Sequence, residues 1–154
     1  MSDTEAKDPL ALLRFRAMDL LARREHSAHE LETKLATKFP EFEEHIAQVL
    51  SELQQENLQS DHRFAEAFIA SRIRKGQGPY RISQELQQRG VTSGDTKEAL
   101  ASCGQDWFQL AAEVVQRKYG GTPCNSFQEQ ARRSRFLQYR GFSGEQIRSC
   151  FDDD

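Results

Sequence analysis

Three leucines spaced 51 residues apart place the strongest constraint on what this chain can fold into. Leu35, Leu86 and Leu137 each fall near the end of a predicted helix. The next apolar positions after Leu86 and Leu137 match at offsets of 5, 13 and 14 residues, and the first copy needs one extra residue in its turn. Self-similarity at a period near 50 residues predicts an array of supersecondary units, each burying a face against its neighbour.

Helix-capping signals divide each period into three predicted helices. In the first period, Ser27 and Glu30 form a capping box that begins the second helix, and a third helix is predicted over residues 41–55. In the second period, the turn at Gly76–Pro79 separates the first two helices, and Gly90 ends the second. The alternation of apolar and polar residues that strands require is nearly absent. The sequence therefore predicts an all-α fold, an elongated tandem array of three three-helix repeats.

The third period carries the same helix-capping signals. Ser126 with Glu129, and Ser143 with Gln146, form two further predicted capping boxes. The predicted organisation is a disordered N-terminal tail (residues 1–9), three repeats (residues 10–59, 60–104 and 105–151) and an acidic tail (residues 152–154).

The sequence offers no recognisable catalytic or metal-binding arrangement. A phosphate-binding loop of the GxxxxGK[ST] type is missing, because Gly76-Gln77-Gly78 is followed by Pro79-Tyr80-Arg81. His26 and His29 lack cysteine or acidic partners at metal-ligand spacing, which predicts that both are surface histidines. We therefore expect a protein that is not an enzyme, with no cofactor and no metal site.

Composition favours a cytoplasmic protein. Only 37% of the residues are hydrophobic and 29% are charged, which suits thin helical layers better than one compact globule. No apolar run is long enough to span a bilayer, and the N-terminus lacks the basic-then-apolar layout of a signal peptide. The three cysteines form no CxxC pair, which favours free thiols in a reducing compartment.

Basic residues gather in the second half of the chain. Residues 1–60 carry 7 Lys and Arg against 12 Asp and Glu, whereas residues 61–151 carry 14 against 9. Arginines beside aromatic residues are typical of phosphate or carboxylate recognition, because a guanidinium group forms bidentate hydrogen bonds and stacks on rings. The predicted partner-binding residues lie around the turn between two helices of the second repeat and along a predicted helix of the third: Arg72, Arg74, Lys75, Arg81, Arg132, Arg133, Arg135 and Arg140. Ordinary solvated helix faces would give the same pattern, so these residues alone leave both interpretations open.

Three stretches resemble signature segments of the bacterial RecX family. They are LLARREHSAHEL (residues 20–31), RFAEAFIASRIRKGQGPYRISQEL (residues 63–86) and RFLQYRGFSGEQI (residues 135–147). The resemblance extends from about Leu12 to Phe151, and its middle stretch is the most specific. Asn57 departs from the family pattern where glycine is common, and the loop at residues 121–126 does not match.

The resemblance implies a helical regulator with three tandem three-helix repeats. Members of the family bind the filament that the RecA recombinase forms on single-stranded DNA, and they lodge in its helical groove. They limit filament growth, ATP hydrolysis, strand exchange and co-protease activity, and some also touch DNA directly. The RecA filament is therefore the expected partner of this chain, which is expected to be monomeric.

A direct DNA-binding module is the alternative hypothesis. Three-helix units with short turns resemble helix-turn-helix domains, and the basic half of the chain would suit phosphates. Against this, the net charge is −3, the pI is about 5.8, and Glu66, Glu85 and Glu129 interrupt the basic residues. We expect only weak direct binding to single- or double-stranded DNA.

Overall fold

A computed structural model describes residues 8–152, and within that range the chain consists of helices and short loops, with no β-strand. The first repeat contains α1 (Pro9–Arg23), α2 (Ala28–Lys38), the 3₁₀ helix η1 (Pro40–His45) and α3 (Ile46–Gln55). The second contains α4 (Asp61–Arg74), α5 (Pro79–Gln88) and α6 (Ser93–Ser102). The third contains α7 (Trp107–Tyr119), α8 (Phe127–Arg140) and α9 (Gly144–Ser149). The predicted all-α class is confirmed.

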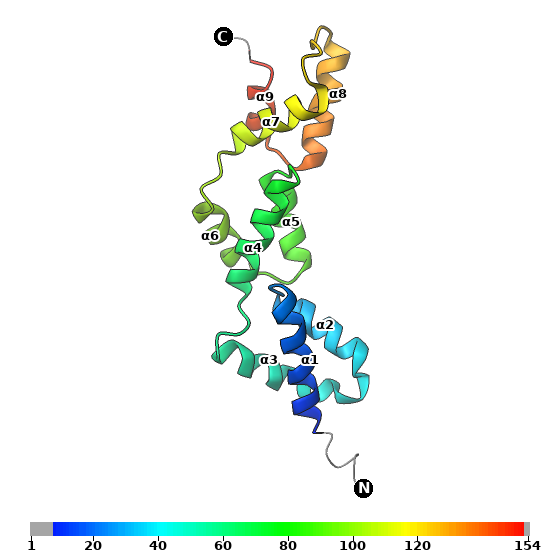
Figure 1. Ribbon diagram of the computed structural model, residues 1–154. Coiled ribbons are helices and arrows are strands. Elements are labelled where there is room, and N and C mark those ends of the chain that lie inside the picture. Colours follow the sequence, from blue (N-terminus) through cyan, green and yellow to red (C-terminus); the bar gives the residue numbers. More distant parts are fainter. Residues whose placement is uncertain (1–7, 153–154) are drawn as a thin grey trace.

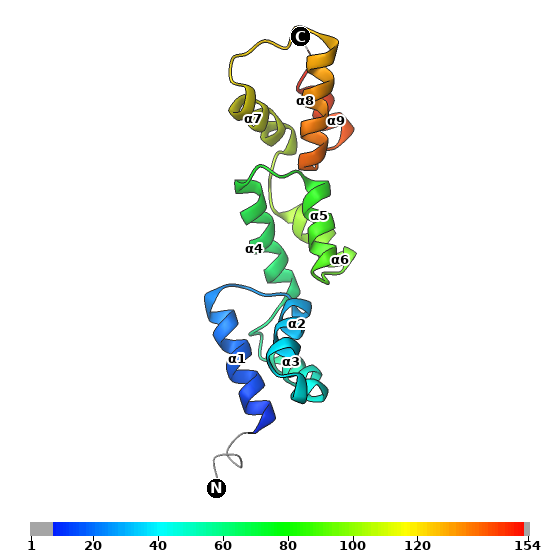
Figure 2. The ribbon, with the colours of Figure 1, turned by 90° about the vertical axis from the view of Figure 1, so that its right-hand side faces the viewer.

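The three repeats stack into one extended body, with the second repeat between the other two (Figure 1). Helices α1, α4 and α7 follow one another along one side of this body, and α2, α5 and α8 follow one another along the other (Figure 2). The arrangement is that of the predicted elongated tandem array.

Each repeat has a hydrophobic core of its own. Leu35, Leu86 and Leu137, which define the 51-residue period, are fully buried in the first, second and third cores. Ile73 and Trp107 pack against both the second and the third core and make them continuous. Within residues 8–152 no residue joins the first and second cores in this way, so that junction depends on polar contacts.

The predicted capping boxes form at two of three positions. Ser27 and Ser143 each form a complete box with the side chain three residues later. Ser126 accepts a hydrogen bond from the backbone N–H of Glu129, but the Glu129 carboxylate pairs with two arginines of α8 instead of reaching back. The prediction for Ser126 is therefore correct for the helix start and wrong for the reciprocal bond.

The predicted helix over residues 41–55 is divided in two. Pro40–His45 forms a 3₁₀ helix, in which Phe42 has non-helical dihedral angles (φ −111°, ψ 18°), and the α-helix begins only at Ile46. The Phe42 ring stacks on Phe39 at 5.9 Å between centroids, and both rings pack against the first core. The segment Pro40–His45 therefore leaves α-helical geometry where Phe39 and Phe42 both pack against the core.

The predicted N-terminal tail ends earlier than residue 9. Pro9 is the first residue of α1, and the Asp8 side chain caps that helix by accepting a hydrogen bond from the N–H of Leu10. Residues 1–7 and 153–154, which make up the rest of the two predicted tails apart from Asp152, lie outside the described residues.

Backbone hydrogen bonds join the second and third repeats. The N–H of Gly78 donates to the carbonyl oxygen of Arg140 at 2.7 Å, and the N–H of Tyr80 donates to that of Gly141 at 2.9 Å. A Cβ atom on Gly78 would lie 2.6 Å from the backbone of Gly141. Only glycine at position 78 lets the two backbones approach this closely.

The junction between the first and second repeats uses the same acceptor position with a different donor. Ser27 lies 51 residues before Gly78, and Arg89 lies 51 residues before Arg140. The Ser27 hydroxyl donates to the carbonyl oxygen of Arg89 at 2.8 Å. The start of one repeat's second helix therefore rests on the end of the next repeat's second helix at both junctions.

His26 is buried at this first junction, so the prediction of a surface position is wrong for this residue. It is 2% exposed, with its Nδ1 3.1 Å from the carbonyl oxygen of Arg24 and its Nε2 3.0 Å from Nζ of Lys34. Burial lowers the pKa of the His26 imidazole, so the ring is neutral and accepts a hydrogen bond from the lysine. The Gln59 side chain, which lies just before α4, donates to the backbone carbonyl of His26 at 3.1 Å. The N–H of Ala28 donates to the carboxylate of Asp61 in α4 at 2.9 Å, which ties this segment to the second repeat. His29 is exposed, as predicted.

Substituting Gly78 with alanine should weaken the junction between the second and third repeats. The added methyl group would overlap the Gly141 backbone, and overpacking of this kind lowers the free energy of unfolding by about 1–3 kcal/mol. Gly121→Ala is the matched control, because nothing lies within 4 Å of a Cβ atom there. Urea denaturation of both variants measures the difference, and equal stability would contradict the close backbone approach.

Candidate functional site

Arg72, a predicted partner-binding residue, is held inside the second repeat. Its side chain is only 16% exposed, and its Nε lies 2.9 Å from Oε1 of Glu85. Its guanidinium carbon lies 4.1 Å from the centroid of the Phe68 ring. Arg81 approaches the other oxygen of the same carboxylate at 3.4 Å. Glu85 therefore bridges two predicted site residues.

The Glu85 carboxylate is ionised in this setting. Partial burial alone would raise the pKa of Glu85, but the hydrogen bonds from Arg72 and Arg81 outweigh it and hold the pKa below its usual value. The charged carboxylate in turn fixes the positions of both guanidinium groups.

Arg81 and Arg140 link the second repeat to the third. The Arg81 guanidinium lies 5.0 Å from the centroid of the exposed Tyr139 ring. Nη1 of Arg140 donates to the carbonyl oxygens of Lys75 at 3.0 Å and Gly76 at 3.3 Å. The structure thus brings three of the predicted site residues, from α5, α8 and the end of α4, to one junction.

Arg133 is the most buried of the predicted residues for which a side-chain exposure is known. Its side chain is 6% exposed, and its Nε pairs with Glu129 at 3.0 Å. Its Nη2 donates to the carbonyl oxygen of Thr122 at 3.0 Å, and its guanidinium lies 4.3 Å from the Tyr119 ring centroid. These contacts give Arg133 the role of holding the loop between α7 and α8.

The remaining predicted residues face solvent. Arg74, Lys75 and Arg135 are exposed and make no ion pair within residues 8–152. Arg132 is also exposed, at 66% of its side chain, and pairs with Glu129 at 2.6 Å. An exposed pair of this kind contributes about 1 kcal/mol or less, so Arg132 can change partners at little cost.

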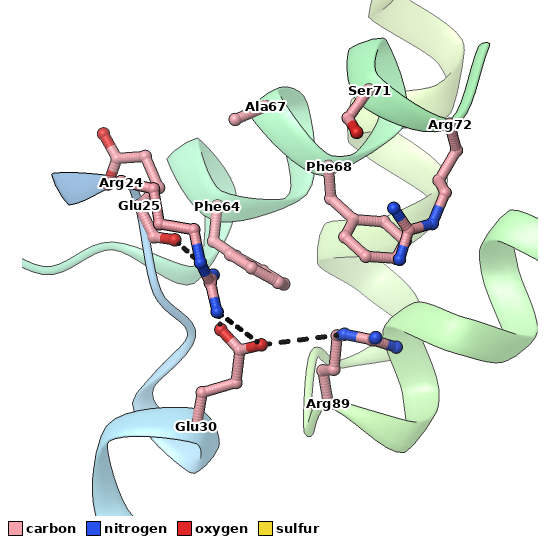
Figure 3. Close-up of a pocket in the computed structure, with 9 residues that line it drawn as sticks. All are labelled: Arg24, Glu25, Glu30, Phe64, Ala67, Phe68, Ser71, Arg72 and Arg89. Carbon is pink, nitrogen blue, oxygen red and sulfur yellow. Dashed lines mark hydrogen bonds and ion pairs between the residues drawn. The ribbon is translucent and has the colours of Figure 1, made fainter. Parts of the chain in front are cut away.

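A hollow of about 350 Å³, which was not predicted from the sequence, lies between the first and second repeats (Figure 3). Its floor includes Phe64 and Phe68 of α4, and its cationic lining consists of Arg24, Arg72 and Arg89. Arg89 lies over the Phe68 ring at 4.7 Å from the centroid. The hollow therefore combines stacked guanidinium groups with an apolar floor.

A repeat signal could have identified part of this hollow. Arg89 precedes Gly90 at the end of the second helix of its repeat, and 51 residues later Arg140 precedes Gly141 in the same way. In both repeats, the arginine of this Arg-Gly pair contacts the preceding repeat. No comparable signal marks Arg24.

Glu30 occupies one side of the hollow. Its carboxylate accepts hydrogen bonds from Arg24 at 3.1 Å and from the backbone N–H of Ser27 at 3.1 Å, and it lies 3.6 Å from Nε of Arg89. Burial alone would raise the pKa of Glu30, but these hydrogen bonds outweigh it and hold the pKa below its usual value. The arginines at this junction therefore already bind one carboxylate of the chain itself.

Three family models match successive parts of this chain. They describe the first, second and third three-helix domains of RecX and match residues 14–53, 60–100 and 105–151. These ranges follow the three repeats of the structure and cover most of the chain. The chain belongs to the RecX family.

Curated relatives agree with this membership. The Regulatory protein RecX of Ectopseudomonas mendocina is 46% identical over 147 residues, covering 93% of this chain and 97% of the relative. That of Halorhodospira halophila is 42% identical over 148 residues, covering 96% and 91%.

Two crystal structures of RecX proteins share the fold. One, described as regulatory protein RecX, has a TM-score of 0.76 at 24% identity and covers 95% of this chain and 73% of that chain. The other, from Lactobacillus salivarius, has a TM-score of 0.76 at 21% identity and covers 94% and 95%. Both confirm the tandem helical fold.

RecX proteins are regulatory proteins and not enzymes, so family membership confirms the prediction that this chain catalyses no reaction. In the described range, residues 8–152, no group of three or more His, Cys, Asp or Glu side chains could hold a metal ion. No helix of that same range is long and apolar enough to cross a membrane.

Reversing Arg72 should destabilise the fold, whereas reversing Arg74 should not. Arg72→Glu removes the Glu85 ion pair and places two carboxylates together beside Phe68. The loss should be roughly 2–4 kcal/mol in the free energy of unfolding, because a mostly buried charge loses its partner. Arg74→Glu changes an exposed residue two positions away and should stay within about 0.5 kcal/mol of the parent. Chemical denaturation of both variants tests this, and equal stabilities would show that Arg72 is not held as described.

Proposed function

We propose that this protein binds the RecA filament on single-stranded DNA, lies in its helical groove and limits its activity. The activities limited are filament growth, ATP hydrolysis, strand exchange and co-protease function. Membership of the RecX family, whose members modulate RecA, supports the choice of partner. The relatives are bacterial regulatory proteins, and the cytoplasm stays the predicted location.

The extended stack of three repeats is the observation that carries the proposal. A body of this shape can follow a helical groove past successive protomers (Figure 1). Small contacts spread along its length then add, because each bound segment raises the effective concentration of the next. A deep pocket is not required for tight binding of this kind.

Exposed cations at the end of α4 and on α8 supply the electrostatic part of the proposed contact. Arg74, Lys75 and Arg135 have no ion pair within the described chain, and Arg132 has only an exposed one. Long-range attraction to acidic filament surface or exposed phosphate would orient the encounter and weaken as salt screens it. The four held arginines, which are Arg72, Arg81, Arg133 and Arg140, contribute by fixing the shape of the binding face.

Direct DNA binding is the second candidate, and the three-helix domains favour it. Such domains resemble helix-turn-helix units, which bind phosphates with their basic residues. In this chain the glutamates of the predicted site are paired with arginines, so they reduce the net positive field there. The two candidates differ in which ligand is bound at lower protein concentration.

Reversing the exposed cations should separate the filament contact from the fold. In the variant Arg74→Glu, Lys75→Glu and Arg135→Glu, inhibition of RecA ATP hydrolysis on single-stranded DNA should weaken by about tenfold or more. Helical content and the unfolding midpoint should stay near the parent values, because all three residues are exposed.

The matched control reverses three other exposed cations, Arg23, Lys38 and Arg117, and so changes the net charge equally. It should inhibit like the parent protein. A parallel titration with naked single-stranded DNA decides between the two candidate functions. If the protein inhibits RecA at a concentration well below the one at which it binds naked DNA, the result supports filament binding. If it binds naked DNA at the lower concentration, the result contradicts filament binding. Equal loss in both triple variants would show that total charge, and not this face, governs binding.

A further inference from the structure

The hollow between the first and second repeats has unused hydrogen-bond donors. Within the described chain, Arg72 hydrogen-bonds only through Nε, which leaves Nη1 and Nη2 without a protein acceptor. Arg89 donates through Nη1 to the backbone carbonyl of Glu85 at 3.1 Å, and its Nε faces Glu30, which leaves Nη2 unused. Both guanidinium groups line the hollow (Figure 3).

Stacking fixes these two guanidinium groups before any ligand arrives. Their carbons lie 4.1 Å and 4.7 Å from the centroid of the same Phe68 ring. The Glu85 carboxylate holds one of them by its Nε, and the Glu85 carbonyl holds the other by its Nη1. A planar donor fork whose position is already set loses little entropy on binding, and it matches the geometry of a carboxylate.

The chain itself shows what this junction recognises. On the side of the hollow away from Arg72, Glu30 lies between Arg24 and Arg89. Its carboxylate accepts hydrogen bonds from Arg24 and faces Nε of Arg89, as a bound carboxylate would. The other side has the same chemistry, two arginines beside an aromatic floor, but no carboxylate of the described residues pairs with both Arg72 and Arg89.

We propose that this hollow binds one carboxylate side chain, Asp or Glu, from a protein segment that carries an apolar neighbour. The carboxylate would be held between Arg72 and Arg89, and the apolar neighbour would lie over the floor of the hollow, which Phe64 and Phe68 line although both residues are largely buried. The proposal deepens the proposed function by giving the chemistry of one filament contact, and its direct test does not depend on that function.

The charges around the hollow favour a protein carboxylate over a nucleic acid backbone. Three arginines line it, but so do Glu25 and Glu30. A strand of successive phosphates would bring several negative charges toward these two glutamates, whereas a single carboxylate can enter between the arginines. The apolar floor likewise suits a side chain with an aliphatic or aromatic neighbour and gives nothing to a phosphate.

A carboxylate introduced on the wall of the hollow should block it. Ala67 is exposed, lines the hollow and makes no side-chain hydrogen bond, so Ala67→Glu adds a competing charge without removing a native contact. Ala70→Glu is the matched control, because Ala70 is also an exposed alanine of α4 but does not line the hollow. Both substitutions should leave helical content unchanged.

The probe is the pentapeptide GLELG, acetylated at its N-terminus and amidated at its C-terminus, and the control peptide is GLQLG. The readout is the NMR signal of the arginine Nε–H groups in the full chain. With GLELG, the signals of Arg72 and Arg89 should shift saturably at millimolar peptide, and GLQLG should leave them in place. Ala67→Glu should weaken the response by about tenfold or more, and Ala70→Glu should not. Absence of the shift, or an equal shift with GLQLG or in Ala67→Glu, would overturn the proposal.

A short oligothymidylate strand and the filament assay complete the test. If the oligothymidylate shifts the same two signals at lower concentration than GLELG, the hollow is a phosphate site and the carboxylate assignment fails. If GLELG binds as expected but Ala67→Glu inhibits the RecA filament like the parent, the carboxylate site stands and its use in the filament contact is overturned. If no variant or parent inhibits RecA, the proposed function fails while the peptide result is still decisive for the hollow.

Discussion

A backbone carbonyl at the end of a second helix is the acceptor on which each junction of this array depends. In the second repeat it belongs to Arg89 and receives the Ser27 hydroxyl, and in the third it belongs to Arg140 and receives the N–H of Gly78. The last carbonyls of a helix have no partner within that helix. Each repeat therefore ends its second helix with a free acceptor, and the preceding repeat satisfies it.

This one contact has consequences for the surface of the protein. The residue that provides the carbonyl is an arginine in both repeats, so each junction also receives a guanidinium group. Arg89 stacks on Phe68 and faces Glu30, and Arg140 donates back to the end of α4. Both arginines thus lie where repeats meet, and the hollow beside Phe68 arises from the same geometry.

The sequence predicted the features of the fold that depend on local chemistry or on strict periodicity. The buried leucines and most helix starts belong to this group, since a cap or an apolar face is determined within a few residues. The 3₁₀ helix at Pro40–His45 was missed because it accompanies the packing of Phe39 and Phe42 on the first core, which the helical period does not reveal.

The candidate site was predicted less completely, because its charges are organised by distant residues. Arg72 was predicted to bind a partner, and it is held by Glu85, 13 residues further along the chain. His26 was expected on the surface, and it is covered through contacts that include Gln59, 33 residues away. The sequence shows which residues are charged, but only the three-dimensional contacts show which of those charges are already used.

Small-angle X-ray scattering of the full chain tests most directly whether the three repeats form one extended body. A compact domain of this length would have a radius of gyration of about 15 Å. The stacked array predicts a value clearly above that figure and a scattering profile that the single extended body reproduces. A monomer with a radius of gyration near 15 Å would contradict the array, and with it the account of the junctions.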